Sequence, residues 1–434
     1  MWQKAMRFLA WLKAKNQIWG LADQLIVSVT SFGAMIVIAR TTSASQLGLY
    51  SIGNSLIVMM LTVQDSLITR PYSIQMFKAV GSPEEHGFSA LLLSWMVSLI
   101  AVIAASGAAL WFAYGAGDSG IAAFALAIAF VAPFALFREF GRRYSFANLK
   151  AYRAFAVDLV AALAILGPMG WLGWTGQLDA ITAIITIGCG AGLSGTLWFL
   201  RRRRAFRYSR AALGQTAAQS WDLGKWLLCS QLAMQFQGYA IHWLCLLIVG
   251  AALTGTYAAC LSVVALANPF LYGFFNLLTP KSVRTLKDQG TGALRRQVFR
   301  DSIMLAAMMA AFTVFIFFAG ETVMSILYSG SEYANQGHVL TVMSLASVAS
   351  AIGAFGGPAA IALQSAERGK ATAAIAIVTG LIGVVSAWHL VSAYGLTGAA
   401  WGLLITELTG AAGRWVLFLR MGQIMPPKPE NLAG

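Results

Sequence analysis

The sequence predicts an all-α protein that crosses a membrane many times, and three observations support this fold class. Hydrophobic residues make up 58% of the 434 residues, charged residues make up 11%, and the mean hydropathy is +0.70. A soluble domain carries about 25% charged residues, so a water-soluble enzyme is excluded. The apolar runs also last about twenty residues, the length that a helix needs to cross ~30 Å of hydrocarbon, unlike the short alternating segments of a membrane barrel.

About twelve apolar segments follow one another along the chain, and each is predicted to be a helix because backbone polar groups in lipid must be satisfied locally. The glycines and proline at 353–358 predict a break in the tenth segment. The segments form two predicted six-helix bundles, residues 1–200 and 226–420, joined by a basic connection at 201–225 and followed by a tail at 421–434. The segments cover residues 19–39, 46–68, 88–113, 120–137, 154–173, 179–200, 226–249, 253–277, 302–319, 337–363, 372–392 and 397–418.

The basic residues predict the orientation of these spans. The formal charge is +14, and every Lys and Arg except Arg40 falls at one of the termini or in a connection on the same side of the membrane. Under the positive-inside rule, both termini lie in the cytoplasm of a multi-pass inner-membrane protein. The run Arg201–Arg204 is therefore interpreted as an anchor that contacts anionic lipid head groups, and nucleic acid is not an expected partner.

Residues before the first span and the four cysteines lead to two smaller predictions. Trp2, Leu9 and Leu12 share one helical face, which predicts a short helix on the cytoplasmic membrane surface, with a solvated leader as the alternative. No cleavable signal peptide is expected. The cysteines stand inside apolar runs without a CxxC pair, so they are predicted to be small core residues and neither disulfides nor metal ligands.

A repeat at half the chain length relates the two predicted bundles. Shifting the sequence by 207 residues aligns the first two spans with the seventh and eighth without a gap. Parallel repeats of this kind build transporters with a site between the halves. The matching residues are Trp19, Leu21, Gln24, Leu25, Ala44, Gly48, Tyr50 and Ser55 on Trp226, Leu228, Gln231, Leu232, Ala251, Gly255, Tyr257 and Ser262.

Polar residues form stripes inside several spans. Gln231, Gln235, Gly238 and His242 share one face of the seventh span, and Gln24 opens the equivalent stripe of the first. Polar residues also follow one side of the second and eighth spans, the latter beginning at Asn268. Such stripes usually face a watery cavity, which predicts a polar space lined by both halves. Hydrogen bonding between packed helices is the alternative interpretation.

Ionisable residues inside the spans are few. Asp23, Asp65, Asp158 and Glu407 are candidates for coupling a proton to transport, although Asp65 is alternatively half of a structural ion pair with Arg70. Arg40 breaks the positive-inside rule. An Arg near a cavity mouth suits phosphate oxygens, so Arg40 and Arg70 are predicted to contact an anionic lipid-linked substrate.

Several functions have no motif in the chain. It contains no GxxxxGK[ST] loop for nucleotide, no HExxH metal motif, no metal cluster and no triad-like arrangement on an external loop. No cofactor is therefore predicted, and an enzyme is not expected.

Three segments resemble polysaccharide exporters of the multidrug/oligosaccharidyl-lipid/polysaccharide (MOP) superfamily. They are IARTTSASQLGLY at 38–50, HWLCLLIVGAALTGTY at 242–257 and the link IALQSAERGKATA. In those families an Asp often opens the second segment, where this chain has His242. The resemblance implies two six-helix bundles in a V, similar to MATE transporters, around a central cavity.

The same resemblance implies a flippase that moves a polyprenyl-pyrophosphate-linked oligosaccharide across the inner membrane by alternating access, for surface polysaccharide. Gln24, Gln231, Gln235, His242 and Asn268 would bind the sugar, and polysaccharide polymerase or export machinery would be a partner. Two alternatives stay open. One is a MATE-type drug or cation antiporter, which would need a cavity rich in carboxylates. The other is a membrane polymerase or glycosyltransferase acting on lipid-linked sugars, which would need a sizeable loop or soluble domain.

Overall fold

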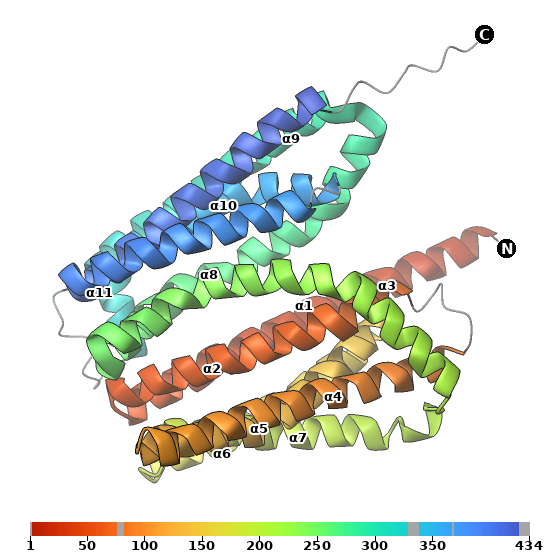
Figure 1. The fold of residues 1–434 in the computed structure, drawn as a ribbon. Coiled ribbons are helices and arrows are strands. Elements are labelled where there is room, and N and C mark those ends of the chain that lie inside the picture. The colour runs from red at the N-terminus through yellow and green to blue at the C-terminus, as the bar shows by residue number, and fades with distance from the viewer. Residues whose placement is uncertain (1, 76–81, 329–337, 367–368, 425–434) are drawn as a thin grey trace. The chain divides into compact units, whose positions relative to one another are not determined.

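The computed structural model describes residues 2–75, 82–328, 338–366 and 369–424, and these residues form helices without a strand. Short π-helical segments at Asp65–Thr69 and Trp111–Gly115 and 3-10 turns at Arg203–Ala205 and Ala265–Ala267 interrupt or join them. Figure 1 shows the arrangement. The helices are α1 (Trp2–Thr41), α2 (Ala44–Gln64), α3 (Arg70–Gln75), α4 (Pro83–Leu110), α5 (Ser119–Ala147), α6 (Ala151–Trp174), α7 (Ala180–Leu200), α8 (Arg210–Val264), α9 (Asn268–Leu327), α10 (Val339–Ser365) and α11 (Gly369–Ile424).

The number of spans agrees with the sequence. Ten helices of the described part are long and apolar enough to cross a membrane. A straight helix of the length of α8 would measure ~82 Å, far more than one bilayer needs. Instead α8 and α11 are broken at Gly250 and Gly395, whose φ angles of 85° and 58° suit glycine and few other residues. Each of these two helices therefore contains two spans, and the predicted all-α fold of about twelve spans is confirmed.

Three local predictions are wrong. Helix α10 runs unbroken past Pro358, because its glycines serve close packing: a Cβ at Gly356 would lie 3.0 Å from the backbone of Ala411. Helix α5 extends to Ala147, well beyond the predicted end at residue 137, because ion pairs described below stabilise its last turns. The cysteines are not all core residues. Cys245 and Cys260 are buried, but Cys189 and Cys229 lie on outward faces, where a small apolar side chain is tolerated against lipid.

The chain divides into two compact units, Met1–Leu232 and Ala233–Gly434. The division falls inside α8, so the predicted connection 201–225 and the first turns of the predicted seventh span belong to the N-terminal unit. In that unit α5 packs against α4, α6 and α7, and α1 packs against α6. In the C-terminal unit α10 packs against both α9 and α11.

Helices α5 and α7 approach closely because α7 carries a row of glycines. A Cβ at Gly188 would lie 2.6 Å from Val131, and Cβ atoms at Gly192 and Gly195 would each lie 2.9 Å from a phenylalanine of α5. Small residues at this spacing allow close contact between transmembrane helices, where lipid supplies no hydrophobic driving force. The glycine row thus fixes α5, the helix that carries most of the arginines considered below.

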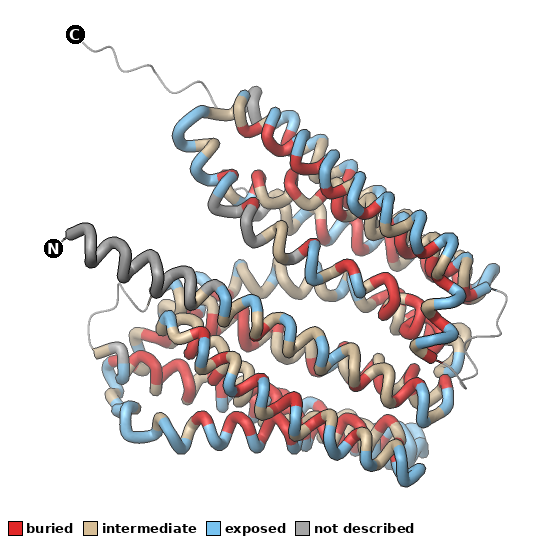
Figure 2. The backbone as a smooth tube through the Cα atoms, turned by 180° about the vertical axis from the view of Figure 1, so that it is seen from behind, coloured by how far each residue is buried: buried red, intermediate tan, exposed pale blue. Residues whose placement is uncertain are grey.

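The exposed faces of the helices are apolar, as expected for surfaces that contact lipid. Figure 2 shows buried and exposed residues alternating around the helices. On α4, Leu99, Ile100 and Ile103 are all at least 60% exposed. Exposed tryptophans mark the ends of helices, as Trp171 and Trp174 do at the end of α6, and such residues favour the membrane–water interface.

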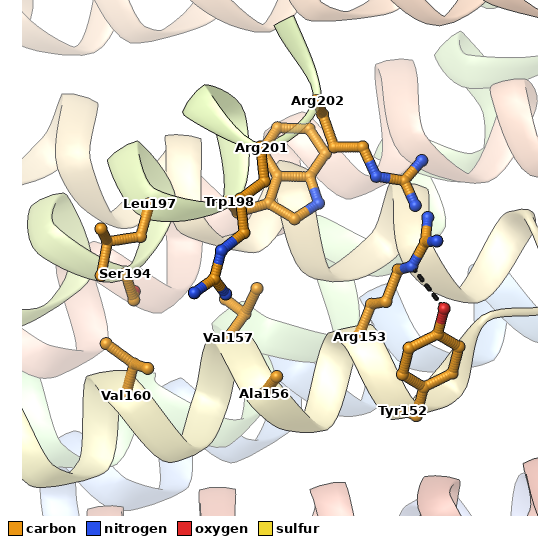
Figure 3. Close-up of a pocket in the computed structure, with 10 residues that line it drawn as sticks. All are labelled: Tyr152, Arg153, Ala156, Val157, Val160, Ser194, Leu197, Trp198, Arg201 and Arg202. Carbon is orange, nitrogen blue, oxygen red and sulfur yellow. Dashed lines mark hydrogen bonds between the residues drawn. The ribbon is translucent and has the colours of Figure 1, made fainter. Parts of the chain in front are cut away.

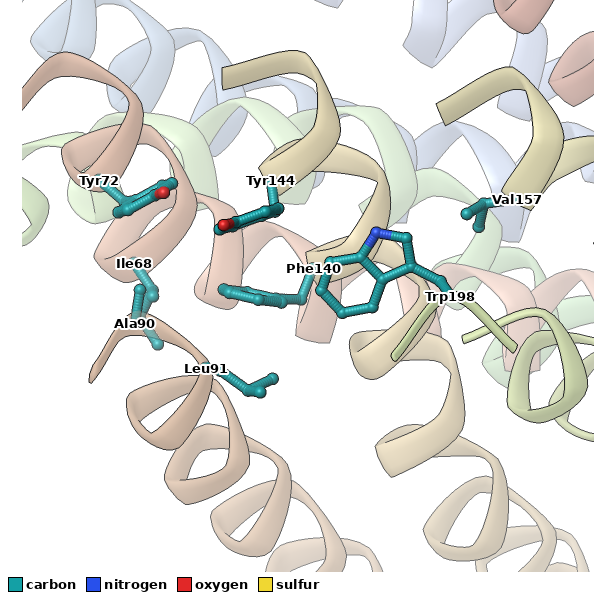
Figure 4. Packing of buried hydrophobic residues seen from close by; sticks show 8 residues of the cluster. All are labelled: Ile68, Tyr72, Ala90, Leu91, Phe140, Tyr144, Val157 and Trp198. Atoms are coloured by element: carbon teal, nitrogen blue, oxygen red, sulfur yellow. The ribbon is translucent and has the colours of Figure 1, made fainter. Parts of the chain in front are cut away.

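An aromatic cluster holds the basic end of the N-terminal unit together (Figure 4). Tyr72 stacks on Tyr144 with ring centroids 5.8 Å apart, and Trp198 meets Tyr144 and Phe140 edge-on. The indole nitrogen of Trp198 donates to the hydroxyl of Ser145 at 3.3 Å, so its polar atom is satisfied. This cluster connects α3, α5 and the end of α7, and it supports the charged groups on either side of it.

Candidate functional site

Asp65, Arg70 and Gln231 form one hydrogen-bonded group in the N-terminal unit. Asp65 lies in the π-helical segment and accepts from Arg70 Nε at 2.6 Å and from the Thr69 hydroxyl at 2.7 Å. The Gln231 amide, oriented with its oxygen toward Arg70, accepts from both terminal nitrogens of Arg70 at 2.6 Å. The structure therefore brings together three residues that the sequence singled out. All three nitrogens of the Arg70 guanidinium contact a partner within this group.

Arg142 is the centre of a second, more buried ion-pair network. Its guanidinium lies 2.7 Å from Asp23, 2.7 Å from Asp158 and 3.2 Å from Glu139. Arg138 also contacts Asp158, at 2.6 Å, and the side chain of Asp158 is completely buried. Three helices meet here, because Asp23 comes from α1, Asp158 from α6 and the arginines from α5. The network ties these helices to one another.

The two groups are continuous through Arg143. Its Nε lies 2.7 Å from Glu139 and 3.5 Å from Asp65. The network contains the acids Asp23, Asp65, Glu139 and Asp158 and the arginines Arg70, Arg138, Arg142 and Arg143, so positive and negative charges balance. Sequence reasoning placed the α5 arginines in a connection and missed Glu139, although the spacing of Arg138, Arg142 and Asp158 would have allowed pairing between adjacent helices.

The C-terminal unit contains a cavity of about 380 Å³ that is lined mainly by apolar side chains, with polar groups among them. Helices α8, α9, α10 and α11 all contribute to its walls. Amides and hydroxyls make up most of the polar lining, and one Glu and one Arg add a single charge of each sign. The polar and charged lining residues are Gln237, Asn268, Ser350, Gln364, Thr372, Thr379, Glu407 and Arg414.

Glu407 and Arg414 face this cavity as a loose ion pair. Their closest atoms are 3.6 Å apart, compared with 2.6–2.7 Å for the shortest contacts of the N-terminal network. Gly353 and Gly410 leave room for the two side chains, since a Cβ at either glycine would lie 2.7 Å from the Glu407 carboxylate or the Arg414 guanidinium. Nearby, the Thr379 hydroxyl donates to the Gln237 side-chain oxygen at 3.4 Å.

The remaining predicted site residues lie apart from the cavity. Gln24 and Gln235 are half-buried, Arg40 is exposed at the last turn of α1, and His242 packs edge-on against Tyr257 at 5.0 Å. Of the predicted stripe of the seventh span, only Gly238 lines the cavity. The neighbouring Met234 and Gln237 line the cavity, so the face of α8 at the cavity is rotated from the predicted one.

Metal binding has no support in the described ranges, which contain no cluster of three or more His, Cys, Asp or Glu able to hold a metal ion. The chemistry that the two regions offer is hydrogen bonding and charge pairing.

Several solved structures share this fold. A multidrug resistance MATE family transporter of the MOP superfamily, in an inward-facing conformation, matches with a TM-score of 0.75 and 16% identity over 92% of this chain and 95% of its own. A MOP superfamily transporter from Pyrococcus furiosus, described as having a binding pocket of reverse polarity, matches with a TM-score of 0.68 and 14% identity over 95% and 96%. An outward-facing MATE structure matches with a TM-score of 0.66 and 15% identity over the same shares.

No family model matches the chain, and no curated protein matches it in sequence. At 14–16% identity, the structural matches establish the fold. The chain is therefore a multi-pass membrane protein with the fold of MOP superfamily transporters.

Proposed function

We propose that this protein is an alternating-access transporter that moves a polyprenyl-pyrophosphate-linked oligosaccharide across the bacterial inner membrane, with both termini in the cytoplasm. The fold supports a transporter, and the sorting of basic residues supports the orientation. The observation that carries the choice of substrate is the pairing of charges inside the spans.

Each carboxylate deep in a described span has an arginine within 4 Å. This holds for Asp23, Asp65, Glu139, Asp158 and Glu407. A pathway for organic cations needs carboxylates whose charge is not already neutralised. A neutral, hydrogen-bonding cavity is better suited to sugar hydroxyls, which both donate and accept.

The cavity of the C-terminal unit supplies the sugar contacts in this proposal. Its volume lies within the range of ligand pockets, roughly 300–1,000 Å³. Asn268 and Gln237 present amides to it, and Thr379 presents a hydroxyl. Gln24, Gln231, Gln235 and His242 stay proposed sugar contacts, with less support because they lie outside this cavity.

Arg40 and Arg70 are the proposed contacts of the pyrophosphate. Arg40 is exposed at the end of α1, as this role requires. Arg70 is bound to Asp65 and Gln231, so it would have to exchange these partners for phosphate oxygens. A charged phosphate is a stronger acceptor than the neutral Gln231 amide, so it would replace Gln231 first, whereas Asp65 already accepts a charge-assisted bond of the same kind.

Among the proposed coupling residues, Glu407 is the best placed. It combines a long ion pair with a position beside the cavity, whereas Asp65 and Asp158 are held by short contacts. Exchange of Glu407 between Arg414 and substrate would link binding to rearrangement of α10 and α11.

The test is translocation in proteoliposomes. The purified protein should move a fluorescent polyprenyl-pyrophosphate-linked oligosaccharide between leaflets, and Glu407→Gln should slow this at least ~10-fold, equivalent to 1.4 kcal/mol. Glu321→Gln is the matched control, because Glu321 is exposed and lies outside the cavity lining. Normal translocation by Glu407→Gln would contradict the assigned role of the cavity.

A drug or cation antiporter is the second candidate, favoured by the MATE transporters among the structural matches. Efflux of a cationic dye by proteoliposomes, without movement of the lipid-linked oligosaccharide, would select this function. The enzyme alternative receives no support from the fold.

A further inference from the structure

A second cavity, of about 370 Å³, lies between the start of α6 and the end of α7 in the N-terminal unit. Three arginines line it: Arg153 in the first turn of α6, and Arg201 and Arg202 directly after α7. Figure 3 shows the ends of Arg153 and Arg202 turned toward each other, with the Trp198 indole beside Arg201. Cationic side chains that converge in this way repel one another unless an anion lies between them.

Carboxylates of the described residues do not neutralise this cluster. No ion pair of the described residues involves Arg153, Arg201 or Arg202, and the lining contains no Asp or Glu. Asp158 follows the lining residue Val157 on α6, but it points to Arg138 and Arg142 of α5. The position of Arg153 is fixed by its own neighbour, since its Nε donates to the Tyr152 hydroxyl at 2.8 Å.

The floor of the same cavity is apolar. Ala156 and Val160 continue along α6 from the arginines toward the middle of the membrane, and Leu197 faces them from α7. Leu197 is exposed, so this strip is open on the lipid side. The cavity thus combines a cationic end at the predicted cytoplasmic surface with an apolar strip that leads into the bilayer.

We propose that this α6–α7 cavity binds one anionic glycerophospholipid of the inner leaflet. The arginines contact the phosphate of the head group, and an acyl chain lies along Ala156, Val160 and Leu197. Basic pockets between helices on the cytoplasmic side suit anionic head groups, and the arginine fork matches phosphate geometry. The site is separate from the proposed transport cavity and does not depend on the transported substrate.

The occupant is a lipid and not free phosphate, because phosphate would use only the cationic end of the cavity. The site also differs from a diffuse basic surface. Arg203 and Arg204 belong to the same basic run, yet they are exposed and do not line the cavity. They provide a control with the same loss of charge at nearly the same place.

The test measures how much dioctanoylphosphatidylglycerol raises the unfolding temperature of the purified full-length protein in a neutral detergent. Parallel titrations use dioctanoylphosphatidylcholine, inorganic phosphate and sodium chloride at matched ionic strength. The variants are Arg201→Gln/Arg202→Gln, the control Arg203→Gln/Arg204→Gln, and Ala156→Phe, which fills the apolar strip without changing charge.

Phosphatidylglycerol should stabilise the wild type saturably, and phosphatidylcholine should not. Arg201→Gln/Arg202→Gln should weaken the affinity for phosphatidylglycerol at least ~10-fold, which is the scale expected for losing charge-assisted hydrogen bonds. Arg203→Gln/Arg204→Gln should weaken this affinity less than ~2-fold. Ala156→Phe should weaken the stabilisation by phosphatidylglycerol and leave any effect of phosphate unchanged.

Two results would overturn the proposal. One is an equal loss of stabilisation in the two double variants, and the other is stabilisation by phosphate equal to that by phosphatidylglycerol. If Arg201→Gln/Arg202→Gln fails to fold, Ala156→Phe alone tests the proposal, because unchanged binding of phosphatidylglycerol by this variant would also overturn the proposal.

Discussion

The ion-pair network of the N-terminal unit and the Glu407–Arg414 pair of the C-terminal unit differ in how closely their charges are paired. In the N-terminal unit, four acids and four arginines form a continuous network with contacts as short as 2.6 Å, and Asp158 is completely buried. In the C-terminal unit, Glu407 and Arg414 are 3.6 Å apart and face a cavity. Charges that are fully paired and desolvated hold helices together, whereas a loose pair beside open space is available to a ligand.

This difference indicates that one half of the repeat serves mainly as a rigid support and the other carries the exchangeable contacts. A buried ion pair stabilises only while both partners are present, since removal of one leaves an uncompensated charge in a medium of low polarity. The substitutions below are ordered from the largest expected effect to the smallest, and each would strengthen or weaken this division of roles.

Arg142→Met should have the largest effect. It leaves Asp23 and Asp158 without their shared partner, which should reduce stability by ~3–5 kcal/mol. The measurement is thermal unfolding of the purified protein in detergent. Arg284→Met is the control, because Arg284 is 86% exposed and pairs only with Asp288 at 3.4 Å. Similar unfolding temperatures for the two variants would mean that the network is not a structural support.

Gln231→Leu should have an intermediate effect. It removes two hydrogen bonds to the charged Arg70, and hydrogen bonds to charged groups contribute ~1.5–3 kcal/mol. Because Gln231 lies on α8 and Arg70 on α3, the loss should also increase hydrogen exchange in the turns of α8 around Gln231. Gln215→Leu on the same helix is the comparison. Unchanged exchange in α8 would remove Gln231 from the network.

Glu407→Gln should change stability by ~1 kcal/mol or less, because its ion pair is long and partly exposed. The accompanying loss of translocation should be far larger than this change in folding. If Glu407→Gln lost stability as strongly as Arg142→Met, the Glu407–Arg414 pair would be structural as well, and the contrast between the two units would disappear.

His242→Phe should have the smallest effect. The ring packs against Tyr257 at 5.0 Å, and a substitution that conserves its shape usually costs less than ~1.5 kcal/mol. Translocation should fall by about 2-fold at normal stability, a change of ~0.4 kcal/mol, because His242 is a proposed sugar contact outside the cavity. Unchanged translocation would remove His242 from the proposed sugar contacts.

The sequence predicted the helical class and the number of spans because these follow from composition and from the length of apolar runs, whereas the placement of both termini in the cytoplasm stays a prediction. Twenty-residue runs have few alternatives in lipid. Its alternative interpretation of Asp65 as half of an ion pair with Arg70 agrees with the structure, because the two residues lie close together on one stretch of helix.

Contacts between helices were not predictable in the same way. The joining of Asp23 and Asp158 through Arg142 depends on which faces of α1, α5 and α6 meet, and local sequence does not encode this. For a related reason, Gln237 lines the cavity and the predicted Gln235 does not. A polar stripe predicts that a helix faces a cavity, but the packing of that helix against its neighbours decides which of its residues line the cavity.

The central claim is that the cavity beside Glu407 is water-filled and receives the substrate. Its most direct test is the reaction of Asn268→Cys with a membrane-impermeant maleimide, in protein whose exposed Cys189 and Cys229 are replaced by Ser. We predict rapid labelling at position 268 that the lipid-linked oligosaccharide slows saturably. Phe318→Cys should stay unlabelled, because Phe318 is 80% exposed on an apolar helix face. Absence of labelling at position 268, or labelling that the substrate does not change, would contradict the account.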